Sequence, residues 1–98
     1  MERDAIIARL RERQDELKAR GVRHAALFGS RARGDHHPDS DIDIMIELEP
    51  EAHVGLWGFV EIVQAIESMF PTSVDVSNIR SQRPHVRPYA ARDAIYAF

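Results

Sequence analysis

Residues 24–46 read HAALFGSRARGDHHPDSDIDIMI, and this stretch decides how the chain folds. It begins with an apolar run that ends at Gly29-Ser30, and ten residues later it gives Asp41-Ile42-Asp43. Apolar residues then recur at every second position up to Leu48, which predicts a strand with one buried face. Because residues two apart on a strand share a face, we expect the carboxylates of Asp41 and Asp43 to point the same way, with Cα atoms about 6 to 7 Å apart.

Two carboxylates held this close repel each other unless a cation lies between them. Mg²⁺ prefers oxygen ligands and is commonly bound by one or two carboxylates together with substrate phosphates. The spacing of Asp41 and Asp43 therefore favours a divalent metal site at the start of the strand.

The upstream pair, Gly29-Ser30, supplies what a phosphate needs. A strand that runs into a turn can aim backbone N–H groups at an anion, and a glycine lets the phosphate approach closely because it has no Cβ. Ser30 adds a hydroxyl and is also a good residue to cap a helix. Arg31 and Arg33 follow at once; they can contact the nucleotide or a partner, or simply be solvated.

A third acid, Asp75, lies between Val74 and Val76 in a separate strand candidate. Its neighbours are expected to face the core, so Asp75 should face the other side of the sheet, where the aspartate pair can be. The alternative is an exposed surface residue. A phosphate cradle beside three carboxylates is what metal-assisted phosphoryl or nucleotidyl transfer requires.

Composition limits the class of protein. The chain has 98 residues, a formal net charge of −3, 44% hydrophobic and 30% charged residues, and no cysteine. These numbers predict one domain over residues 1–98, without disulfides or thiolate metal sites, which fits the cytosol. No apolar run approaches the roughly 20 residues of a membrane span, and nothing in the charge suggests direct DNA binding.

Hydrophobic periodicity predicts helices over residues 2–20 and 55–70. The first carries an apolar stripe and stops at Gly21; the second ends before Pro71. The stripes comprise Ile6, Ile7, Leu10 and Leu17 in the first helix, and Leu56, Phe59, Val60, Val63, Ile66 and Phe70 in the second. Trp57 is expected in the core, the alternative being an exposed contact for a partner.

Strands are predicted over residues 23–28, 41–48, 73–76 and 95–98. Residues 29–40 form a loop that can hold one helical turn after Ser30, and another turn is predicted over 87–92. The order of elements indicates an α/β (α+β) fold in which a small mixed sheet is flanked by helices.

The combination of Gly29-Ser30 with Asp41-Ile42-Asp43 resembles the signature of the DNA polymerase β-like nucleotidyltransferases. The fuller string, residues 29–34 with residues 40–43, is similar to that of the minimal nucleotidyltransferases of the MNT type. The resemblance covers nearly the whole chain: Val74-Asp75-Val76 falls where the family has its third acidic strand, and residues 92–96 are similar to the family's usual ending.

The resemblance implies that Asp41 and Asp43 bind two Mg²⁺ ions, and that Asp75 completes the metal site and helps to take the proton from the attacking hydroxyl. Gly29 and Ser30 would hold the phosphates of ATP, the substrate. Many members are antitoxins for a HEPN-domain toxin, an RNase, and silence it by transferring AMP to one of its tyrosines.

Two other functions stay open at this point. The chain can be a non-enzymatic antitoxin that neutralises its partner by complex formation, or it can transfer a nucleotide to a small molecule or an RNA end. The catalytic half fills almost the whole chain and leaves little surface to enclose a small acceptor, which favours a macromolecular acceptor.

Overall fold

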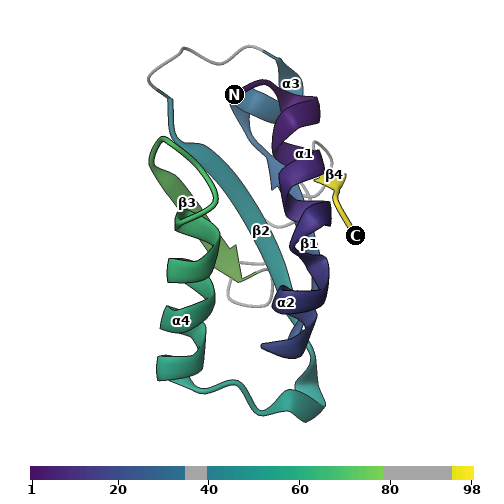
Figure 1. Cartoon of the computed structure of the whole chain (residues 1–98), viewed down its shortest axis with the longest axis vertical. Helices are drawn as coiled ribbons and strands as arrows, with labels where there is room; N and C mark the ends of the chain where they lie inside the picture. The colour runs from purple at the N-terminus through teal and green to yellow at the C-terminus, as the bar shows by residue number, and fades with distance from the viewer. Residues whose placement is uncertain (35–39, 79–93) are drawn as a thin grey trace, which may run out of the picture.

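A mixed sheet of four strands is the centre of the structure, a computed structural model that describes residues 1–34, 40–78 and 94–98. The strands run in the order β3-β2-β1-β4. Along the chain the elements are α1 (Arg3–Glu12), α2 (Gln14–Ala19), β1 (Val22–Phe28), α3 (Ser30–Arg33), β2 (Ile42–Leu48), a 3₁₀ turn (Pro50–Ala52), α4 (Leu56–Glu67), β3 (Val74–Asn78) and β4 (Ile95–Tyr96). The predicted mixed sheet with flanking helices is confirmed (Figure 1).

Strand pairing follows from the connections. β1 is antiparallel to both β2 and β4, whereas β2 and β3 are parallel. A parallel pair needs a crossover, and α4 provides it by running back between the end of β2 and the start of β3 (Figure 1). The first residues of β2 and β3 therefore lie at the same end of the sheet.

The helices α1, α2 and α4 cover one face of the sheet, α1 and α2 next to β1 and α4 next to β3 (Figure 1). The alternation in β2 sends Ile42, Ile44 and Ile46 into this layer, where each is at most 1% exposed. They pack in one cluster with Ile6, Leu10 and Leu17 of the first two helices and Ile62 and Ile66 of α4. Burial of these branched side chains holds the sheet and helices together.

The predicted first helix is two helices, because α1 ends at Glu12 and α2 begins at Gln14. Arg13 at the break has φ −105° and ψ 13°, and its N–H donates to the Leu10 carbonyl. Residues 13–15 are polar, so no core side chain holds that turn in regular helical register. The predicted stop at Gly21 is confirmed, since β1 starts at the next residue.

The predicted face of α4 is partly wrong. Ile62 is fully buried although the predicted stripe omits it, and Leu56, which the stripe includes, is 72% exposed. Trp57 is 79% exposed, so the expectation of a core position is also wrong. α4 has more apolar residues than one buried face requires. Its hydrophobic periodicity is therefore compatible with either of two neighbouring faces of the helix packing against the sheet. In the described residues, no helix combines the length and the apolar content needed to cross a membrane.

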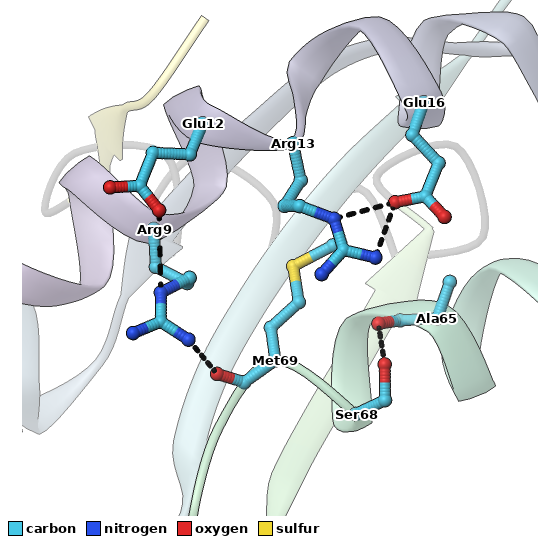
Figure 2. A network of polar contacts seen from close by, with 7 residues as sticks. All are labelled: Arg9, Glu12, Arg13, Glu16, Ala65, Ser68 and Met69. Atoms are coloured by element: carbon cyan, nitrogen blue, oxygen red, sulfur yellow. Dashed lines mark hydrogen bonds and ion pairs between the residues drawn. The ribbon is translucent and has the colours of Figure 1, made fainter.

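Polar contacts join the helical layer at its edge. The Arg9 guanidinium donates to the Met69 carbonyl at 3.1 Å, which ties α1 to the turn after α4 (Figure 2). Arg13 binds Glu16 through Nε at 2.7 Å, and the Ser68 hydroxyl donates to the Ala65 carbonyl. The Arg9 contact links α1 to the segment after α4, whereas the other two contacts are local, one at the junction of α1 and α2 and one at the end of α4.

Candidate functional site

Strand register places two of the three predicted acids side by side. In the parallel pair β2·β3, Asp43 is the direct partner of Asp75. The flanking residues of each aspartate, Ile42 and Ile44 in β2 and Val74 and Val76 in β3, pack into the core. Both carboxylates therefore project from the face of the sheet opposite to the helices, as predicted.

Asp41 lies just before the first residue of β2, and its side chain is exposed. The pKa of Asp43 is raised, mainly because Asp43 is partly buried. The negative charges of Asp75 and Asp41 raise this pKa further. Arg33 and Arg31 act in the opposite direction and offset part of the rise in the pKa. The three acids thus form one electrostatic group centred on Asp43.

This concentration of carboxylate oxygens fits a divalent cation, because a cation offsets the repulsion that Asp75 and Asp41 add to the effect of burial on the pKa of Asp43. Among the residues that the structure describes, no three His, Cys, Asp or Glu side chains already form a ready metal-ligating cluster. Asp43 and Asp75 are the adjacent pair, and metal binding by Asp41, Asp43 and Asp75 together remains a prediction.

Gly29 stands directly against this pair. Its backbone has φ 75° and ψ −153°, a combination adopted essentially by glycine alone. A Cβ built at Gly29 would lie 2.5 Å from Asp43 Oδ2. The glycine is therefore required both by the backbone and by the closeness of the carboxylate, and it leaves the space over Asp43 open.

The helical turn predicted after Ser30 is confirmed as α3, which ends at the left-handed Gly34. The N-cap position of this turn is Gly29, so Ser30 is its first helical residue and does not cap it. Ser30 is half-buried beside the site. Phosphate binding by Gly29 and Ser30 remains a prediction.

Arg31 and Arg33 differ sharply in their surroundings. Arg31 is only 2% exposed, and its guanidinium donates to the Met1 carbonyl at 2.7 Å and to the Ser40 carbonyl at 2.8 Å. Arg33 is exposed on the same turn and is close enough to Asp43 to lower its pKa. Nucleotide contact stays a prediction for both residues, and the geometry makes Arg33 the more accessible of the two.

The structural role of Arg31, which bonds two backbone carbonyls, is not predicted from the sequence. Ser40 is the residue before Asp41, so the bond from Arg31 to the Ser40 carbonyl fixes the chain where it enters β2. In the structure Arg31 and Ala32 are the buried residues of α3, an orientation that the sequence of so short a turn does not indicate. Residues 35–39 and 79–93, including the predicted turn over 87–92, lie outside the described residues.

Comparisons with known proteins show the family of the chain. Residues 7–97 match the model of the nucleotidyltransferase domain family. The protein adenylyltransferase MntA of Thermococcus cleftensis is 32% identical over 82 residues, covering 83% of this chain and 81% of that protein.

Solved structures share the fold. A structure described as a minimal nucleotidyltransferase superposes with a TM-score of 0.81 at 27% identity, covering 97% of this chain and 95% of the other. A toxin–antitoxin crystal structure with AMP-PNP has a chain that superposes with a TM-score of 0.69 at 21% identity, covering 90% of this chain and 72% of the other. With the family match over most of its length, and the paired acids beside a glycine-serine turn, the chain belongs to the nucleotidyltransferase domain family and is an enzyme of the minimal nucleotidyltransferase type.

Proposed function

We propose that this enzyme is a Mg²⁺-dependent protein adenylyltransferase that moves AMP from ATP to a tyrosine hydroxyl of a HEPN-domain toxin and thereby acts as its antitoxin. The observation that carries the proposal is the pairing of Asp43 with Asp75 beside Gly29. The name of the relative MntA supports a protein acceptor, and the family resemblance supports a toxin as that acceptor. The reaction would take place in the cytoplasm, where ATP is available.

The chain's own residues have distinct tasks in this reaction. Gly29 leaves room for the triphosphate next to Asp43, and Ser30 and Arg33 supply polar and positive groups on the same turn. The acceptor oxygen attacks the α-phosphorus in line, the bond to the β-phosphate oxygen breaks, and pyrophosphate leaves. Asp75, the exposed member of the pair, takes the proton of the attacking hydroxyl.

Asp41, Asp43 and Asp75 would hold two magnesium ions. When bound, magnesium would neutralise the charge that develops on the phosphoryl oxygens. Burial is the largest cause of the raised pKa of Asp43, and the nearby charges of Asp75 and Asp41, which add to it, are the repulsion that a bound cation would relieve.

The test is transfer itself. The protein is mixed with ATP and Mg²⁺, with and without the protein encoded by the adjacent gene, and that protein is examined by mass spectrometry for added AMP. We expect a mass increase of one or more AMP groups with the wild type, and none with Asp41→Asn plus Asp43→Asn or when EDTA removes the metal.

The same experiment separates catalysis from occlusion. If the wild type adds no AMP while the double variant still inhibits the toxin's RNase activity, neutralisation occurs by binding and the proposal is wrong. Added AMP on a small molecule or an RNA end, but not on the protein, would move the acceptor to another class.

A further inference from the structure

Asp41 is held in place differently from the other two acids. Asp43 lies within β2, where it pairs with Phe28 of β1 on one side and with Asp75 of β3 on the other. The described register of β2 begins at Ile42, so Asp41 has no partner in it. The strand pairing that positions Asp43 and Asp75 therefore does not position Asp41, and its carboxylate needs another support if it is to share a cation with them.

Hydrogen bonds hold both peptide groups that flank Asp41. On the side of β2, the N–H of Ile42 donates to the Ser73 carbonyl at 2.9 Å. On the other side, the Ser40 carbonyl accepts from Arg31 Nη2 at 2.8 Å. Because each peptide group is planar, holding both groups restricts φ and ψ of the residue between them. The direction in which Asp41 projects its side chain therefore depends on Arg31.

Arg31 is itself fixed firmly enough to act as this support. It is 2% exposed, and among residues 1–34, 40–78 and 94–98 it is the one buried charged side chain. Its Nη1 donates to the Met1 carbonyl at 2.7 Å, so both arms of the guanidinium are engaged. Met1 packs against the hydrophobic core, and the N-terminus lies beside α3 (Figure 1). A planar guanidinium bonded on both arms cannot turn without breaking a hydrogen bond.

The burial of this charge argues for a specific task. Burying a guanidinium costs free energy that its hydrogen bonds must offset, and an apolar side chain could fill the same space without that cost. An apolar side chain could not hold the Ser40 carbonyl. Arg31 also follows Gly29 by two residues, so the turn beside Asp43 carries the support for Asp41 as well.

We propose that Arg31 is a positioning residue for cation binding: by holding the Ser40 carbonyl, it directs the Asp41 carboxylate so that Asp41 and Asp43 can bind one divalent cation together. In this role Arg31 acts through the backbone of Ser40 and does not touch the cation. The inference rests on the proposed function for the presence of the cation.

The test is a double-mutant cycle between Arg31→Lys and Asp41→Asn. Lysine keeps the positive charge near Asp43, but one ammonium group cannot hold two carbonyls as the guanidinium does. The probe is Mn²⁺ alone, which is titrated into the metal-free protein and followed by the electron paramagnetic resonance signal of the free ion. This readout requires neither nucleotide nor turnover.

Arg31→Lys should weaken Mn²⁺ binding about tenfold or more, the usual effect of losing a group that orients a metal ligand. In the Asp41→Asn background, the same substitution should change Kd by less than about twofold, because the carboxylate that Arg31 directs is absent. Equal weakening in both backgrounds would show that Arg31 acts on the whole site or fold, and it would overturn the proposal. Unchanged affinity in Arg31→Lys, or no Mn²⁺ binding by the wild type, would overturn it too.

Arg11→Lys is the matched control, because Arg11 Nε also donates to a backbone carbonyl, that of Ala97, at 2.8 Å. Ala97 follows β4, and β1 separates β4 from β2 in the sheet. Arg11→Lys should therefore bind Mn²⁺ as the wild type does. Circular dichroism and urea unfolding show that each variant is folded at the temperature of the titration. Weakening by Arg11→Lys as large as that by Arg31→Lys would contradict the assigned role.

A measurement on the wild type decides the proposal even if Arg31→Lys does not fold. The amide of Asp41 belongs to the peptide group whose carbonyl Arg31 holds, so ¹⁵N relaxation of this amide shows whether that group is fixed. In the metal-free wild type we expect an order parameter of about 0.85, the value of rigid backbone, and in Arg31→Lys a fall towards about 0.6 at Asp41 but not at Asp43. A mobile Asp41 amide in the wild type would overturn the proposal.

Failure of the proposed function gives a different result. If the wild type adds no AMP to the protein encoded by the adjacent gene but the cycle shows the coupling, adenylylation is wrong and Arg31 still positions Asp41. If AMP is transferred but the cycle shows no coupling, the proposed function stands and the positioning role is wrong.

Discussion

Asp43 and Gly29 approach each other so closely that a Cβ on Gly29 would lie 2.5 Å from Asp43 Oδ2. The two residues come from different elements, since Gly29 follows β1 and Asp43 is in β2, where Phe28 is its direct antiparallel partner. The antiparallel pairing of β1 with β2 thus brings the glycine-serine motif and the aspartate motif into direct contact, although ten residues separate the two motifs in the sequence.

Gly29→Ala should abolish most of the transfer activity. The added methyl group must push the Asp43 carboxylate away, and alanine is strained at this φ and ψ, which together cost about 1 to 3 kcal/mol. Displacement of a catalytic group by about 1 Å can lower the rate roughly 100-fold. Activity is measured with the acceptor and stability by urea unfolding.

Gly34→Ala is the matched control, because Gly34 also has a positive φ but, among the residues that the structure describes, none beyond its chain neighbours has an atom within 4 Å of the position a Cβ would take. It should lose about 1 kcal/mol of stability and keep its activity. Equal losses of activity in both variants would show that backbone strain, and not contact with Asp43, is the cause.

Asp43→Asn should stabilise the metal-free protein at neutral pH. The pKa of Asp43 is raised in the folded state, so the folded protein holds this proton more tightly than the unfolded chain does. Wild-type stability from this group is present below the ordinary aspartate pKa of about 3.9 and is lost as the pH rises through the raised pKa. The Asp43→Asn variant has no carboxyl group to ionise at this position, so it does not lose this stability as the pH rises.

Urea unfolding in EDTA at pH 7 and pH 3.5 tests the direction of this difference in stability between the variant and the wild type. The variant should be the more stable protein at pH 7, and its advantage should shrink towards pH 3.5. Addition of Mg²⁺ should stabilise the wild type and not the variant, because a ligand stabilises only the state that binds it. A variant that is less stable than the wild type at pH 7 in EDTA would contradict the prediction.

Arg31→Ala should unfold the site locally or globally, whereas Arg33→Ala should not. Arg31 is buried and bonds two backbone carbonyls, and loss of such charged hydrogen bonds costs about 3 kcal/mol. Arg33 is exposed, so its removal should change stability by less than about 0.5 kcal/mol.

Nucleotide affinity distinguishes the two arginines further. If Arg33 contacts the triphosphate, Arg33→Ala weakens ATP binding in calorimetry while its urea midpoint stays at the wild-type value. Arg31→Lys should recover only part of the lost stability, because one ammonium group cannot reproduce the two-pronged guanidinium contact. A stable Arg31→Ala protein with weakened ATP binding would reverse the assignment.

Ile62→Ala should destabilise the protein by about 2 to 5 kcal/mol, the usual cost of truncating a buried isoleucine. Leu56→Ala removes a side chain of similar size from an exposed position and should cost less than about 0.5 kcal/mol. Thermal and urea unfolding measure both. Similar losses would contradict the observed orientation of α4.

The amino-acid sequence by itself determined the strands, the turn after Ser30, the order of elements and the shared face of the acids. These features depend on short-range periodicity: a strand repeats every two residues, so Ile42, Ile44 and Ile46 can be buried only if Asp43 faces the other way. The sequence predicted Gly29 only for the space it leaves, and the structure adds a φ and ψ that exclude other residues.

Only the tertiary structure decided which strand lies beside which, and with it the register that makes Asp75 the partner of Asp43. It also decided that α4 buries Ile62 and exposes Leu56 and Trp57, and that Arg31 lies inside while Arg33 lies outside. An apolar helix or an arginine-rich turn fits several orientations equally well by its own periodicity. The choice among them comes from contacts with residues distant in the chain, which no local pattern contains.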